Sequence, residues 1–114
     1  MNEAYVLDRE LILERLGGDA DILGIMIEMY LQDLDSYAGN LKAALDAGDA
    51  KLLQREAHTV KGLLSSFADE PGTKAAFDIE QQAKTNDLSG LAAPIATLQA
   101  RLYAVGEVLK GEMN

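Results

Sequence analysis

The sequence contains no cysteine and no tryptophan, and among its 114 residues it has one histidine and two prolines. Without cysteine, the chain can form neither a disulfide framework nor a thiolate metal site. Its apolar runs are all shorter than the roughly 20 residues that a membrane-spanning helix requires. Its N-terminus lacks the basic stretch and apolar core of a secretory signal. We therefore expect a cytoplasmic protein that does not span a membrane.

Positive charge is also scarce. Nineteen Asp and Glu residues outnumber ten Lys and Arg residues, which gives a net charge of −9 and an isoelectric point of about 4.4. Nucleic acids and anionic membrane surfaces are bound by basic faces, so we expect neither as a partner. The 48% apolar content and the length suit one globular domain with a modest core. We expect a monomeric domain over residues 1–114, ordered from about 8 to 110.

Apolar residues recur every three or four positions along five segments, and no segment shows the alternation of a β-strand. Three segments follow an aspartate that can cap a helix N-terminus, namely Asp8, Asp19 and Asp49. The expected helices cover residues 9–16, 20–47, 49–68, 71–84 and about 90–110. The short Gly48-Asp49 connection favours antiparallel packing of the helices on either side. The sequence thus predicts an all-α fold, an antiparallel four-helix bundle with a short additional N-terminal helix.

The sequence signals for helix are weaker at the two ends of the chain and at the start of the last expected helix. Residues 1–7 precede the first expected helix and are expected to fray. Residues 111–114 follow the last apolar position of the seam, Leu109, and are expected to form a tail. Pro94 stands near the start of the last helix, so this helix either begins close to Gly90 or is kinked at the proline.

The single histidine, His58, lies on the solvent side of the third expected helix. The apolar face of this helix is formed by Leu53, Ala57, Val60, Leu64 and Phe67. His58 points away from that face, beside Lys61 and Gly62. A glycine within a helix costs about 0.5–1 kcal/mol relative to alanine. Gly62 therefore indicates a need for empty space one turn from the imidazole, for a bulky group on the ring or the backbone of a partner.

Basic side chains gather around this histidine. Lys61 can reach over the imidazole ring, and its compact ammonium group suits phosphate. Gln54 and Arg55 lie one turn before His58, and Lys51 lies two turns before it, all on the exposed side. On an acidic protein such a cluster fits an acidic partner site. The alternative is an ordinary solvated helix face with interspersed charge.

These residues resemble a known family, the histidine-containing phosphotransfer (HPt) domains of His–Asp phosphorelays. The resemblance extends from about Asp8 to Leu109. It rests on four motifs, which occur in order as Arg15-Leu-Gly-Gly-Asp19, Ala47-Gly-Asp49, Ala57-His-Thr-Val-Lys-Gly62 and Ile79-Glu80. Each motif is short, and the ordered set is fairly specific.

The resemblance implies that His58 accepts a phosphoryl group on Nε2 from an aspartyl phosphate of a receiver domain and passes it to another receiver. It implies that Glu80 accepts a hydrogen bond from Nδ1–H, that Lys61 balances the phosphoryl charge and that Gly62 clears the approach. The domain would be a phosphoryl carrier without kinase activity of its own.

The resemblance also implies the partners. Response-regulator receiver domains would dock beside the histidine, and a sensor or hybrid histidine kinase would act elsewhere in the relay. The receiver would bring the Mg²⁺, and this chain would bind no cofactor. The residues expected at the docking surface are Lys51, Gln54, Arg55, Gly62 and Ser65.

The chain departs from the family pattern where the third expected helix meets the fourth. Leu63 and Leu64 stand where family members tend to have two small residues, and Gly72 and Ala75 stand near two positions where they tend to have leucines. We interpret this as an exchange of volume between facing helices, which cores tolerate. It predicts that Leu63 or Leu64 approaches the Gly72–Ala76 turn.

The sequence leaves three alternatives to the carrier function. A bundle that only binds receivers or acts as a scaffold could have lost phosphotransfer, although His58, Lys61 and Glu80 are all present. A carboxylate-bridged two-metal bundle needs Glu-x-x-His motifs, whereas Arg55 occupies the position three before His58. A hydrolase needs a nucleophile paired with the histidine, and Ser65 lies two turns away.

Overall fold

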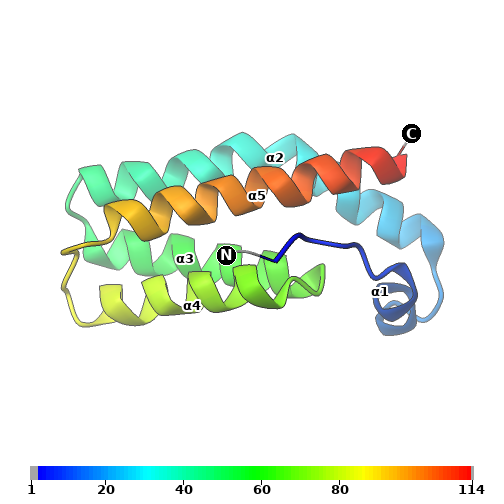
Figure 1. Ribbon diagram of the computed structural model, residues 1–114, viewed down its shortest axis with the longest axis horizontal. Helices are drawn as coiled ribbons and strands as arrows, with labels where there is room; N and C mark the ends of the chain where they lie inside the picture. Colours follow the sequence, from blue (N-terminus) through cyan, green and yellow to red (C-terminus); the bar gives the residue numbers. More distant parts are fainter. Residues whose placement is uncertain (1–2, 114) are drawn as a thin grey trace.

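The computed structural model describes residues 3–113. Its five helices are α1 (Arg9–Arg15), α2 (Ala20–Asp46), α3 (Ala50–Ser66), α4 (Glu70–Lys84) and α5 (Ala92–Met113). No β-strand occurs in the described range. Helices α2 and α5 lie side by side, α3 and α4 form a second pair, and α1 sits at one end of the bundle (Figure 1). The predicted all-α bundle with an additional N-terminal helix is confirmed.

Capping residues begin the helices where the sequence predicted. Side-chain oxygens of Asp8, Asp19 and Asp49 accept hydrogen bonds from backbone N–H groups in the first turns of α1, α2 and α3. These N–H groups have no partner inside their own helices. Gly48 has a φ of +65°, a left-handed conformation that ends α2 just before α3 starts. Pro94 is the third residue of α5, where its missing N–H breaks no helical hydrogen bond.

The N-terminal segment differs from its prediction. Tyr5 is buried, and its hydroxyl donates a hydrogen bond of 2.8 Å to the carbonyl of Phe67 at the end of α3. The carbonyl of Glu3 accepts a hydrogen bond from the guanidinium of Arg101 in α5. Residues 3–7 therefore contact the bundle, and residues 1 and 2 of the segment that was expected to fray lie outside the described residues. Burial of the aromatic ring and these hydrogen bonds offset the entropy lost on ordering the segment.

The C-terminal end differs as well. Helix α5 continues to Met113, so residues 111–113 form its last turn, and only Asn114 of the predicted tail lies outside the described residues. An ion pair of 2.9 Å between Arg9 and Glu112 joins this turn to α1. The apolar pattern could not predict this extension, because the contacts of the last turn come from another helix.

The junction of α3 and α4 shows the predicted exchange of volume. Leu64 is completely buried, and Leu63 packs against the core while partly buried. A Cβ atom placed on Gly72 would lie 2.8 Å from Cδ1 of Leu64 and would overlap the Asp69 carboxylate. The prediction is confirmed, because a leucine of α3 fills the space that a glycine of α4 leaves empty.

A buried ion pair fastens α5 to the turn between α3 and α4. Nη2 of Arg101 lies 2.6 Å from Oδ1 of Asp69, and their side chains are 7% and 0% exposed. Asp69 stands just before α4, yet its side chain makes no capping hydrogen bond, since the guanidinium engages both of its oxygens. The hydrogen bond from Arg101 to Asp69 raises the pKa of this guanidinium. The pair thus fixes the start of α4 relative to α5.

Candidate functional site

Helix α3 presents His58 to solvent. The buried positions of this helix form one stripe that faces the core, made of Leu53, Ala57, Val60 and Leu64. The side chain of His58 lies outside this stripe and is 67% exposed. The apolar period of α3 therefore turns the only histidine outward, as predicted.

Glu80 reaches His58 from the neighbouring helix α4. The glutamate side chain is only 5% exposed, and its Oε2 lies 2.7 Å from Nδ1 of His58. Its other oxygen, Oε1, accepts a hydrogen bond of 2.7 Å from Nζ of Lys61. One buried carboxylate thus bridges the histidine and the lysine of α3.

The Glu80 carboxylate remains charged in spite of its burial. Burial by itself raises the pKa of this carboxyl, but the hydrogen bonds and charges of Lys61 and His58 lower it below its ordinary value of 4.5. Glu80 is therefore an ionised hydrogen-bond acceptor at neutral pH. In the neutral imidazole the proton then resides on Nδ1, which leaves a free lone pair on Nε2 at the opposite side of the ring.

Lys61 interacts with two residues of α4. Besides its contact with Glu80, its Nζ lies 5.4 Å from the centroid of the Phe77 ring, a cation–π distance. Its side chain is 26% exposed. An anionic group close to His58 would therefore share this ammonium group, which has three N–H donors, with the Glu80 carboxylate.

Gly62 leaves an opening that nothing in the described chain fills. The residue is exposed, and a Cβ atom at this position would meet no other atom within 4 Å. Packing inside the bundle therefore requires glycine at position 72 but not at position 62. The free surface beside His58 is available to a group from outside, in agreement with the sequence.

An open depression surrounds His58 between α3 and α4. Its other lining residues are Lys51, Gln54, Arg55, Thr59, Glu80 and Lys84. The sequence predicted Lys51, Gln54 and Arg55 at this surface but did not predict Lys84. Lys84 follows Glu80 by four residues and so shares its face of α4. That spacing is the signal by which the sequence could have placed it.

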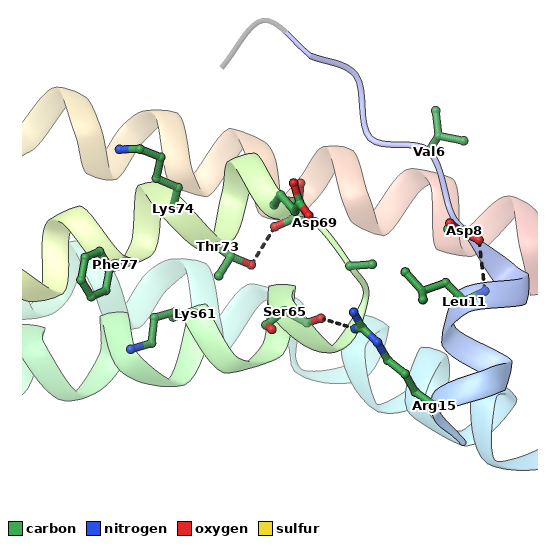
Figure 2. Close-up of a pocket in the computed structure, with 12 residues that line it drawn as sticks. Val6, Asp8, Leu11, Arg15, Lys61, Ser65, Asp69, Thr73, Lys74 and Phe77 are labelled. Carbon is green, nitrogen blue, oxygen red and sulfur yellow. Dashed lines mark hydrogen bonds between the residues drawn. The ribbon is translucent and has the colours of Figure 1, made fainter. Parts of the chain in front are cut away.

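Ser65 does not join the other expected docking residues. It lines a second depression, between α1, α3 and α4, and its carbonyl accepts a hydrogen bond of 3.2 Å from Nη1 of Arg15 (Figure 2). Lys61 and Phe77 also line this second depression. The depression around His58 extends toward the N-terminal end of α3, where Lys51 lies, and does not include Ser65, which lies two turns away in the opposite direction.

Within residues 3–113, no group of three or more His, Asp or Glu side chains is arranged to hold a metal ion. None of the described helices combines the length and the apolar character needed to cross a membrane.

Comparisons with known proteins bear on the family and on the fold. A sequence model of the Hpt domain family matches residues 25–108. The crystal structure of histidine-containing phosphotransfer protein B (HptB) from Pseudomonas aeruginosa PAO1 has a TM-score of 0.84 at 24% identity, over 96% of each chain. The HPT domain from the Hpt sensor hybrid histidine kinase of Shewanella has a TM-score of 0.81 at 19% identity, over 94% of this chain and 92% of that one. At these identities the two structures establish the fold alone. A comparison with curated proteins finds no match.

Proposed function

Because this chain belongs to the Hpt domain family and acts in phosphotransfer within two-component phosphorelays, we propose that His58 is the residue that carries the phosphoryl group. One observation carries this assignment. The contact of 2.7 Å between Glu80 and Nδ1 leaves the lone pair of Nε2 free on a side chain that is 67% exposed. His58 is also the only histidine of the chain.

In the forward step, the lone pair of Nε2 attacks the phosphorus of an aspartyl phosphate on the partner. A P–N bond forms, the P–O bond to the aspartate breaks, and the aspartate carboxylate leaves with the electron pair. The imidazole becomes positively charged and keeps its proton on Nδ1, beside the Glu80 carboxylate. In the reverse step the P–N bond breaks, Nε2 regains its lone pair, and the aspartate of a second receiver takes the phosphoryl group.

Glu80 and Lys61 act as positioning residues for this chemistry. Glu80 holds the imidazole in the reactive tautomer and stabilises the positive charge that develops on the ring. Lys61 keeps the Glu80 carboxyl ionised and balances the added phosphoryl charge once the group is in place. Gly62 leaves the surface beside the ring open for the approaching partner.

The proposed partners are response-regulator receiver domains, with a sensor or hybrid histidine kinase at the head of the relay. Phosphoryl transfer depends mainly on positioning and on neutralising charge. The receiver would supply Mg²⁺ and its acidic pocket, while this chain supplies the nucleophile and needs neither a cofactor nor kinase activity. We place the domain in the cytoplasm as a monomer that does not bind nucleic acid, and the net charge of −9 supports the last point.

The test is transfer from receiver domains that have been phosphorylated with radiolabelled acetyl phosphate in the presence of Mg²⁺. Wild type should acquire acid-labile label, as expected for a phosphoramidate bond, and His58→Gln should acquire none. Label that is stable to acid, or equal labelling of the variant, would exclude His58 as the carrier. No label from any receiver would favour a bundle that binds receivers without exchanging phosphate.

A further inference from the structure

The chain has two phenylalanines, and they lie in different surroundings. Phe67, at the end of α3, is 1% exposed and belongs to the hydrophobic core. Phe77, in the middle of α4, is 44% exposed and lies outside that core. A single exposed apolar side chain is ordinary on a protein surface. Core packing therefore does not explain why an aromatic residue stands at position 77.

The ring of Phe77 is next to the ammonium group of Lys61. Nζ of Lys61 lies over this ring, 5.4 Å from its centroid, and 2.7 Å from Oε1 of Glu80. Phe77 precedes Glu80 by three residues, so the two side chains share one face of α4 and both reach Lys61 on α3. Figure 2 shows Phe77 and Lys61 at the same end of the second depression. The ammonium group thus has two partners on one helix.

The two partners of Lys61 differ in charge. Glu80 is an ionised carboxylate, whereas an aromatic ring attracts a cation through its quadrupole and has no net charge. A second carboxylate at position 77 would leave an excess of negative charge near His58, which would oppose the arrival of an anionic phosphoryl group. Phe77 instead restricts the flexible side chain of Lys61 without cancelling its charge.

We propose that Phe77 is a positioning residue for phosphoryl transfer. Its ring holds the ammonium group of Lys61 beside Glu80, where this group keeps the carboxylate ionised and stays available to an anionic group on His58. The proposal rests on the proposed function and adds to it a residue that acts through Lys61. When the ring no longer attracts the cation, Lys61 spends less time beside Glu80, so His58 should react more slowly with any phosphoryl donor.

The experiment changes the ring at position 77 in three ways. Phe77→Leu removes the aromatic face, Phe77→Tyr retains it, and pentafluorophenylalanine, incorporated at position 77 alone, keeps the ring but reverses the polarity of its face. The matched control is Tyr103→Leu, because Tyr103 of α5 is 43% exposed and contacts Asp35 of α2, away from Lys61. Urea denaturation checks that each variant is folded.

Each protein is labelled by a phosphorylated receiver and, separately, by phosphoramidate. Phosphoramidate is a small donor that transfers its phosphoryl group to the imidazole as ammonia leaves, so it needs no protein surface. Phe77→Leu and the fluorinated ring should lower the rate of labelling about two- to fivefold with both donors. Phe77→Tyr and Tyr103→Leu should match wild type. In a Lys61→Met background, the fluorinated ring should cause no further loss.

Equal rates in wild type and in the fluorinated variant would overturn the proposal. A loss with the receiver alone would also overturn it, because Phe77 would then contact the partner and not position Lys61. A further loss in the Lys61→Met background would show that the ring acts independently of Lys61, which is a third contradiction. In each of these cases acid-labile label on wild type leaves the proposed function intact, whereas absence of label from both donors would remove the proposed function itself.

Discussion

The site combines an exposed histidine with a buried glutamate that contacts it. His58 must be open to a partner, and 67% of its side chain is exposed, whereas the Glu80 side chain is 5% exposed. A hydrogen bond in a low-dielectric surrounding is stronger than one in water. Glu80 can therefore hold the imidazole tautomer from inside the protein without covering the nitrogen that reacts.

Replacement of His58 by Gln should abolish phosphorylation and leave the fold intact. The side chain is largely exposed and contributes no apolar contact to the core, and the Gln amide can donate a hydrogen bond to Glu80 in place of the imidazole. The free energy of unfolding should therefore stay within about 1 kcal/mol of wild type. Chemical denaturation followed by circular dichroism measures this. A substantial loss of helicity would mean that the histidine has a structural role.

Replacement of Glu80 by Gln should slow transfer and change how stability depends on pH. The pKa of Glu80 is lowered in the folded protein, so its ionised form adds stability above its ordinary pKa of 4.5, and this stability disappears as the pH falls below that value. The difference in unfolding free energy between wild type and the variant should therefore shrink as the pH falls below 4.5. A difference that does not depend on pH would show that the charge of Glu80 does not stabilise the fold.

Helices α3 and α4 are complementary to one another in two different ways. Near their connection, Leu64 of α3 packs into the space above Gly72 of α4. Two turns farther along α4, polar side chains meet instead, and Glu80 contacts His58 and Lys61. The close apolar packing fixes the register of the two helices, and the register brings the carboxylate opposite the imidazole.

Gly62 and Gly39 offer a matched pair of substitutions to alanine. Both are exposed positions within helices, where a Cβ atom would meet no other atom within 4 Å. Each change should stabilise the protein by about 0.5–1 kcal/mol. Only Gly62→Ala should also slow transfer from a receiver, because it narrows the opening beside His58. Unchanged transfer in Gly62→Ala, measured with the same receiver, would show that this opening is not needed.

At the scale of the whole molecule, distant segments meet at the turn between α3 and α4. Tyr5 donates to the carbonyl of Phe67, while Arg101 binds both Asp69 and the carbonyl of Glu3. The N-terminal segment, the turn and α5 are thereby joined. These contacts anchor the start of α4, the helix that carries Glu80.

Loss of the buried ion pair between Arg101 and Asp69 should destabilise the protein strongly. Arg101→Met leaves the Asp69 carboxylate buried without a partner, so the free energy of unfolding should fall by about 3–5 kcal/mol. The matched control is Arg9→Met, which breaks the exposed pair with Glu112 and should cost no more than about 1 kcal/mol. Urea denaturation measures both. Adding Asp69→Asn to Arg101→Met should recover part of the loss, and equal costs for Arg101→Met and Arg9→Met would contradict the account.

Local patterns in the sequence were sufficient to predict the helices and the outward position of His58. Helix caps act within one turn of the chain, and apolar periodicity selects which face of a helix is buried. These short-range effects predicted Asp8, Asp19 and Asp49 as caps and the exposed face that carries His58. Gly62 is exposed and a Cβ atom there would meet no other atom within 4 Å, but its role beside His58 stays a prediction.

Only the tertiary structure decided which side chains from different helices meet. It placed Lys84 beside His58, left Ser65 on another surface, ordered residues 3–7 through Tyr5 and paired Arg101 with Asp69. It also engaged Lys61 with Glu80. Periodicity specifies which face of each helix is buried, but the register between two helices depends on the packing of the whole core. Side-chain pairs between helices follow from that register.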